Sequence, residues 1–235
     1  MLLRTRGQLG RHVGLKPRKY VLPPEFQEAA RAERERELKA VEDFVQGAVS
    51  ADLERMGASL DDLEFSYHEG GGWAAAFSQV SAEAIPQVTK EFFLRLVLRD
   101  GDSLRQAVGD DRALVIGFRA LLPPHEGPEM KLYRGTAATS LTTKEYGASW
   151  TTSIDAGRAY AKTGMCRTSS KGSVLLSAIA PAGAILCAPA ILDDSYDEQE
   201  YIVDPERLRE VQVEEEFPGL SHEELQALRA ETRKA

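Results

Sequence analysis

The sequence predicts an α+β fold in which helices fill the first half of the chain and strands fill the second. Apolar residues recur at spacings of three and four between residues 25 and 122, as they do along one face of a helix. After Pro128 they gather instead in short β-prone runs that glycine and proline separate. The 235 residues are 43% hydrophobic and 28% charged, which is a globular balance.

A basic arm precedes the predicted domain. Residues 1–20 contain six basic side chains and no acidic one, whereas the whole chain carries a net charge of −8. Such an arm can bind phosphates, or it can be an ordinary solvated terminus. We predict an arm at residues 1–24 and one domain at 25–235, comprising a helical part (25–122), a β-rich core (128–216) and a C-terminal helix (221–235).

The helical part begins with a predicted helix from Glu25 to Met56. Ser59, followed by Asp62, marks a second helix start. The first helix should bury one stripe of apolar side chains, formed by Leu38, Val41, Val45, Val49, Leu53 and Met56.

Glycine and proline punctuate the rest of this part. The run Gly70–Gly72 lacks the spacing of a phosphate-binding loop, so we interpret it as a connector. A helix is expected over residues 82–99, with Pro86 in its first turn and a stop at Gly101. Asp102 and Asp110 suit N-caps of two further helices, the last ending at Leu122.

The β-rich core alternates short strands with one helix. That helix covers residues 155–162, with either Ser153 or Asp155 as its cap, and a capping box at Ser221–Glu224 opens the C-terminal helix. The predicted strands cover residues 130–133, 149–153, 173–179, 184–187, 201–203 and the alternating segment around 211–213.

Two carboxylates are expected side by side at the start of the strand EQEYIVDP, residues 198–205. Residues i and i+2 of a strand point to the same face, so Glu198 and Glu200 should influence each other's titration. A pair of this kind suits the cleavage of a glycosidic bond. One carboxylate lies near an oxocarbenium-like carbon, and the other handles the proton of a nucleophile.

Four segments in order resemble the arginine–serine–glutamate class of mono-ADP-ribosyltransferases, which includes bacterial toxins and phage enzymes. They are LYRG with Arg134, SWTTSIDAGRAYA from Ser149, GSVLLSAIAPAGAIL from Gly172, and EQEYIVDPERL from Glu198. The resemblance covers residues 130–215. It implies helices followed by a compact split β-sandwich, with NAD as substrate and no metal.

The resemblance also implies the roles of the reacting groups. Glu200 would hydrogen-bond the ribose 2′-hydroxyl of NAD and stabilise positive charge as nicotinamide leaves. Thr151 would orient Glu200, although Ser149 competes for this position. Glu198 would activate the acceptor, and a glutamate here accompanies arginine acceptors, so a protein arginine is the expected target.

The remaining implied contacts are with NAD and with the acceptor. The Arg134 guanidinium would hold the pyrophosphate or the neighbouring ribose. Trp150 or Tyr160 would stack on nicotinamide, or would simply pack in the core. The implied NAD contacts are Arg134, Gly135, Ser149, Trp150, Thr151, Thr152, Ser153 and Tyr160, and the implied acceptor contacts are Tyr196, Asp197 and Glu198.

Several alternatives stay open. The acceptor could be water, which would make the chain an NAD glycohydrolase, or a nucleic acid or small molecule. A different class is a non-catalytic interaction or phage structural protein with a degenerate transferase-like domain. The acidic segment around Asp193 and Asp194 lacks the EF-hand spacing, so no metal is expected.

The compartment and partners are expectations too. No run approaches 18 apolar residues and no secretory signal opens the chain, so no membrane association is expected. Two cysteines, Cys166 and Cys187, indicate a reducing compartment and should be buried. We expect a cytoplasmic protein, in its own cell or in a host reached by phage infection or secretion, with an immunity or inhibitor protein as a further partner.

Overall fold

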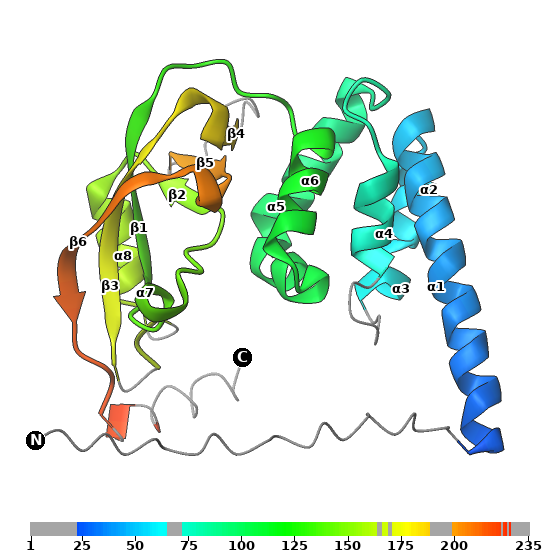
Figure 1. Cartoon of the computed structure of the whole chain (residues 1–235), viewed down its shortest axis with the longest axis horizontal. Helices are drawn as coiled ribbons and strands as arrows, with labels where there is room; N and C mark the ends of the chain where they lie inside the picture. The colour runs from blue at the N-terminus through cyan, green and yellow to red at the C-terminus, as the bar shows by residue number, and fades with distance from the viewer. Residues whose placement is uncertain are drawn as a thin grey trace, which may run out of the picture. The chain divides into compact units, whose positions relative to one another are not determined.

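A computed structural model describes residues 23–64, 72–163, 166–168, 171–188, 199–221, 223–224 and 226. The chain divides into two compact units, Met1–Glu35 and Arg36–Ala235. In the first unit, the described residues form the opening turns of helix α1 (Pro24–Ser50), where Arg31 Nε donates to Glu35 Oε1 over 3.2 Å. The second unit holds the later turns of α1 and all other elements, helices first and strands after, as the sequence predicts (Figure 1).

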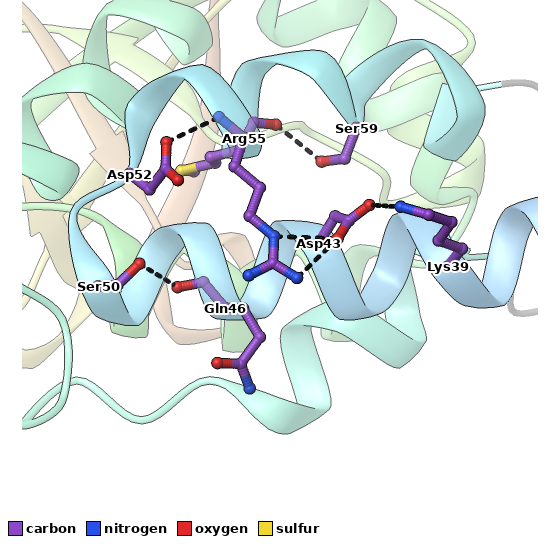
Figure 2. Close-up of polar contacts among 8 residues, drawn as sticks. Lys39, Asp43, Gln46, Ser50, Asp52, Arg55 and Ser59 are labelled. Atoms are coloured by element: carbon purple, nitrogen blue, oxygen red, sulfur yellow. Dashed lines mark hydrogen bonds and ion pairs between the residues drawn. The ribbon is translucent and has the colours of Figure 1, made fainter.

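The predicted first helix is too long, because the chain turns at Ala51. This residue has a φ of 59°, and the next residue, Asp52, accepts a hydrogen bond from Arg55 N over 3.0 Å and caps α2 (Leu53–Ala58). Arg55 also donates from Nε and Nη2 to Asp43 Oδ1, at 2.9 and 2.7 Å, and Lys39 pairs with the same carboxyl group (Figure 2). These two cations lower the pKa of Asp43, Lys39 contributing most.

The predicted apolar stripe of α1 is partly wrong. Leu38 is 60% exposed and Val49 is 42% exposed, whereas Val41, Phe44 and Ala48 are buried. Phe44 belongs to an aromatic cluster with centroid separations of 5.3–6.4 Å, mostly edge to face, which also contains Trp73, Phe77, Phe93 and Phe118. Packing of Phe44 in this cluster therefore determines which face of α1 is buried, and that face is rotated by about one residue from the predicted stripe.

The next two helices are short. As predicted, α3 (Leu60–Glu64) begins directly after Ser59. The prediction that Gly70–Gly72 form a connector is wrong for Gly72, which is the first residue of α4 (Gly72–Gln79). Gly70 and Gly71 lie outside the described residues.

Helix α5 (Gln87–Val108) starts later than predicted, because Pro86 is its N-cap rather than a residue of its first turn. Asp100 has a non-helical backbone, with φ of −127° and ψ of 21°, so α5 consists of two helical stretches that meet at a kink. The predicted break at Gly101 is therefore present one residue earlier, and Asp102, the predicted start of the next helix, lies in the second stretch. Asp110 caps α6 (Asp111–Leu121), as predicted, by accepting hydrogen bonds from two backbone N–H groups.

Every predicted strand is present in one six-stranded antiparallel sheet with the order β4-β5-β2-β1-β3-β6. Three 3-10 turns, at 166–168, 182–184 and 205–207, and the short helix α7 (Ser140–Thr143) were not predicted. The strands are β1 (Met130–Ala137), β2 (Ser149–Thr151), β3 (Ser173–Ala180), β4 (Ile185–Cys187), β5 (Glu200–Val203) and β6 (Arg209–Phe217).

Helix α8 (Ile154–Ala161) packs against the sheet next to β1 and β3 (Figure 1). Ser153, not Asp155, is its N-cap, because the Ser153 hydroxyl accepts a hydrogen bond from Ala156 N over 3.2 Å. Glycines allow the backbone of α8 to lie very close to that of β1. A Cβ on Gly135 of β1 would lie 2.2 Å from Ala161 N and 2.5 Å from Gly157 O.

The C-terminal capping box forms as predicted. Ser221 N donates to Glu224 Oε2 over 2.7 Å, and Glu224 N donates to Ser221 Oγ over 3.2 Å. Residues 222, 225 and 227–235 of the predicted helix lie outside the described residues. No described helix is both long enough and apolar enough to cross a bilayer.

Removing the Asp204 carboxylate should destabilise the second unit. Asp204 follows β5 and is 6% exposed. Its carboxylate accepts a hydrogen bond from Arg119 Nη2 of α6 over 2.9 Å and forms an ion pair with Arg207 Nε over 3.2 Å. It therefore links the helices to the sheet. We expect Asp204→Ala to lower the free energy of unfolding by about 2 kcal/mol in urea denaturation.

The matched control is Glu206→Ala. Glu206 pairs with Arg112 over 3.3 Å, but both side chains are largely exposed, so its loss should change the free energy of unfolding by less than about 0.5 kcal/mol. Equal effects of the two substitutions would contradict a linking role for Asp204.

Candidate functional site

A cavity of about 630 Å³ lies where helices α5, α6 and α8 meet strands β1, β2 and β5. Its volume is within the range of about 300–1,000 Å³ that small-molecule sites occupy. Helices and strands both contribute apolar and polar side chains to its lining. The polar residues that line it include Arg99, Arg105, Tyr133, Arg134, Ser149 and Glu200.

A hydroxyl–carboxylate contact lies in the wall of this cavity. In the ladder between β2 and β5, Thr151 is opposite Glu200 and Ser149 is opposite Ile202, so Ser149 and Thr151 share a face with Glu200. The Ser149 hydroxyl donates to Glu200 Oε1. The Thr151 hydroxyl accepts a hydrogen bond from Ser153 N over 3.0 Å.

The Ser149 hydroxyl thus contacts Glu200 directly, while Thr151 lies opposite Glu200 in the ladder, so both hydroxyls remain candidates for orienting this carboxylate. The sequence alone did not distinguish the two hydroxyls, because Ser149 and Thr151 are two positions apart in one strand. Each can reach the neighbouring strand from the same face.

Arg134 ties β1 to β2 beside this contact. It is the fifth residue of β1 rather than the strand end that the sequence predicted, and its Nη1 donates to the carbonyl oxygen of Ser149. Gly147, with a φ of 75°, brings the preceding loop against the guanidinium, since a Cβ there would lie 2.9 Å from Arg134 Nη2. The arginine thus holds the backbone of the residue whose hydroxyl contacts Glu200.

The other predicted NAD contacts occupy different environments. Gly135 and Tyr160 line the cavity, and Tyr160 is 44% exposed. Trp150 also borders it but is 1% exposed, and its indole N–H donates to Gly147 O over 3.1 Å. Its burial favours packing over stacking on a ligand. Thr152 and Ser153, which were also expected to contact NAD, are not among the residues that line the cavity, and the Ser153 hydroxyl instead caps α8.

The predicted strand does not extend back through Gln199. Strand β5 begins at Glu200, and Gln199 has a φ of 46°, which lies outside the extended region. The regular strand alternation on which the pairing of Glu198 with Glu200 depended therefore does not extend through Gln199, and the placement of Glu198 stays a prediction. Tyr196, Asp197 and Glu198 lie outside the described residues, as does the turn predicted to recognise the acceptor.

Sequence reasoning missed the role of Gln199. The Thr152 hydroxyl donates to Gln199 Oε1 over 2.8 Å, and Thr152 N donates to Gln199 O over 3.3 Å. These bonds lie one residue beyond the last paired position of the β2–β5 ladder. A left-handed backbone at a residue other than glycine or asparagine leaves no signature in the sequence.

An ion pair anchors the helix that follows the site. Arg158 Nε of α8 donates to Glu215 Oε1 of β6 over 2.7 Å, and Asp155 contacts the same guanidinium at 2.6 Å. The hydrogen bond with Arg158 lowers the pKa of Glu215, and the same bond raises the pKa of Arg158. The pair thus favours the charged forms of both groups in the folded state.

This shift predicts an acid-dependent contribution to stability. A carboxyl whose folded pKa is lowered stabilises the fold above its unfolded pKa, about 4.3 for glutamate, and loses that contribution as the pH falls through the folded value. We expect Glu215→Gln to remove this part of the pH dependence, measured as the melting temperature between pH 3 and pH 7. A steeper acid loss in the variant than in the wild type would contradict this, and Glu216→Gln on the same strand is the control.

The described residues contain no cluster of three or more histidine, cysteine, aspartate or glutamate side chains that could hold a metal ion. Cys166 and Cys187 are buried, as predicted. Burial raises the pKa of the Cys187 thiol to about 12, so this sulfur stays protonated and weakly nucleophilic at neutral pH.

Comparisons with protein-family models, with curated proteins and with solved structures found no match to this chain. Functional inference therefore depends on the chemistry of the cavity itself. Its distinguishing elements are the hydroxyl-bound carboxylate of Glu200, the strand-linking Arg134 and the α5 wall, in which apolar side chains lie beside the ion-paired Arg99 and Arg105.

Proposed function

We propose that the chain is a mono-ADP-ribosyltransferase, which cleaves NAD and transfers ADP-ribose to an acceptor. The observation that carries this proposal is the contact between the Ser149 hydroxyl and the Glu200 carboxylate, inside a cavity that Arg134 also lines. Arginine, hydroxyl and carboxylate come from three neighbouring strands, β1, β2 and β5. This is the set of groups that the sequence resemblance implies.

The proposed reaction uses the carboxylate as bond breaking begins. The bond between the nicotinamide nitrogen and C1′ of the ribose breaks, and its electron pair leaves with neutral nicotinamide. Positive charge develops at C1′, and the Glu200 carboxylate stabilises that charge while accepting a hydrogen bond from the 2′-hydroxyl. The acceptor then donates a lone pair to C1′ from the opposite face, and its proton passes to a base, for which we propose Glu198.

The other groups bind rather than react. The Arg134 guanidinium suits the phosphate oxygens of NAD, because its planar donors match two oxygens at once. The apolar side chains Val97, Leu114 and Phe118 of the helical wall would exclude water from the breaking bond. Arginine on a protein remains the proposed acceptor, and the cytoplasm the proposed compartment.

The sheet topology supports the finer fold that we propose, a split β-sandwich. Strands β1 and β2 share a single paired position, Tyr133 opposite Thr151, while β1 and β3 share eight. The sheet thus has a narrow junction between its halves, β4-β5-β2 and β1-β3-β6. Residues on both sides of this junction line the cavity.

The proposal is tested with NAD labelled on its adenylate part. The full chain and its Glu200→Gln variant are incubated with this NAD and a cell lysate, and the products are separated into protein, nucleic-acid and small-molecule fractions. Label on protein from the wild type alone supports the proposal. Free ADP-ribose alone indicates a glycohydrolase, label on nucleic acid indicates that acceptor class, and no nicotinamide release from the wild type overturns the enzyme proposal.

A further inference from the structure

We propose that Thr152 and Gln199 form a clamp that holds the Glu200 carboxylate against the Ser149 hydroxyl, which makes Gln199 a positioning residue for NAD cleavage. This inference rests on the proposed function, because it concerns the geometry of the same carboxylate. Gln199 does not line the cavity. It would act through its neighbour rather than through a contact with substrate.

The first observation is the backbone of Gln199. Its φ of 46° places it in the left-handed region, which glycine and asparagine adopt far more readily than glutamine. Such a conformation persists only where the surrounding structure holds it in place. Here it sets the direction in which the chain enters β5 at Glu200.

The second observation is the double connection to Thr152. The Thr152 hydroxyl donates to the side-chain oxygen of Gln199 over 2.8 Å, and the Thr152 amide donates to its carbonyl oxygen over 3.3 Å. Thr152 is therefore hydrogen-bonded to Gln199 through both its side chain and its main chain. Two bonds between the same residues restrict rotation about the chain far more than either does alone.

The position of the clamp gives it a consequence for Glu200. The β2–β5 ladder has only three paired positions, and Glu200 occupies the terminal one, opposite Thr151. The last pair of a short ladder frays easily. The clamp lies one residue beyond this pair, so it closes the open end and fixes the carboxylate relative to Ser149.

The chemistry of Gln199 fits this role. Its amide oxygen accepts the threonine proton without adding a second negative charge beside Glu200. Leucine keeps the size but cannot accept, and asparagine tolerates the left-handed backbone but is one methylene shorter. The three residues thus separate hydrogen bonding, backbone preference and reach.

The test is a double-mutant cycle on the full chain, with nicotinamide release as the assay. We expect Thr152→Val and Gln199→Leu each to lower kcat by about tenfold to a hundredfold, with the KM for NAD and the melting temperature close to wild type. Because both remove the same bond, the double variant should lose no more than either single one. Thr152→Ser, which keeps the hydroxyl, should restore most of kcat.

A matched control variant and the contrary outcomes complete the test of the positioning role. Gln212→Leu makes the same change on the exposed edge strand β6 and should leave kcat unchanged. Additive losses in the double variant, a raised KM with normal kcat, or an unchanged kcat would overturn the positioning role. Gln199→Asn should lower kcat as Gln199→Leu does. Wild-type kcat in Gln199→Asn would show that the left-handed backbone positions Glu200 without the side-chain bond, which would overturn the clamp.

Failure of the clamp is distinguishable from failure of the proposed function. If the wild type releases no nicotinamide, the proposed function fails, and the clamp is judged by hydrogen exchange at the Thr152 amide. Faster exchange at this amide in Gln199→Leu than in Gln212→Leu supports the clamp. Equal exchange in the two variants overturns it.

Discussion

Glu200→Gln is expected to lower NAD cleavage by at least about a hundredfold, the effect of removing one group that stabilises transition-state charge. Glutamine has nearly the same shape, and its amide oxygen can still accept the hydrogen bond from Ser149. It lacks the negative charge, however, and that charge matters most as the nicotinamide bond breaks. Affinity for NAD, measured by calorimetry, should therefore stay close to that of the wild type.

A carboxylate outside the cavity provides the control. Glu206→Gln changes an exposed side chain in the turn after β5 and should alter neither binding nor turnover. Retained turnover in Glu200→Gln would remove this carboxylate from the chemistry. Parallel loss of binding and turnover would instead assign it to NAD binding.

Local patterns were sufficient to predict the β-rich half. Each predicted strand is present, and α8 starts and ends within one residue of the predicted helix, with Ser153, one of its two predicted caps, as the N-cap. Strands of three to nine residues depend on β-prone side chains and on the glycines and prolines between them. These signals lie within a few residues of the structure they specify.

The helical half depends more on tertiary packing, and the prediction was weaker there. The helix break expected at Gly101 lies at Asp100, and Gly101 itself belongs to the helical stretch that follows, where Leu104 and Val108 are buried. Glycine inside a helix costs about 1 kcal/mol, which burial of one leucine side chain offsets. The turn at Ala51 was missed because its positive φ is not marked by glycine.

The candidate site was predictable in its residue types but not in its detailed contacts. The spacing of Arg134, Ser149, Thr151 and Glu200 places them on strands that the structure brings together. Which hydroxyl reaches Glu200 depends on the register of β2 against β5, and local sequence does not encode that register. The clamp at Gln199 likewise depends on a backbone conformation that only the folded chain imposes.

Gly135→Ala is expected to produce the largest loss of stability among the substitutions considered. The new Cβ would meet backbone atoms, 2.2 Å from Ala161 N and 2.5 Å from Gly157 O, so no side-chain rotation can relieve the contact. Helix α8 would have to move away from β1. Overpacking typically costs about 1–3 kcal/mol, and a backbone obstacle places this substitution at the upper end, which lowers the melting temperature by roughly 10 °C.

The control is Gly57→Ala, where a Cβ would come no closer than 3.8 Å to the Phe92 ring. Gly57 lies in α2, so alanine there should stabilise the fold by about 0.4–1 kcal/mol. Opposite signs for the same chemical change would show that the close approach of α8 to β1 is the cause. Because α8 carries Tyr160 and both glycines of this approach line the cavity, Gly135→Ala should also weaken NAD binding. Equal melting temperatures for the two variants would mean that the sheet accommodates the extra methyl group, and the cavity wall would then be softer than these contacts imply.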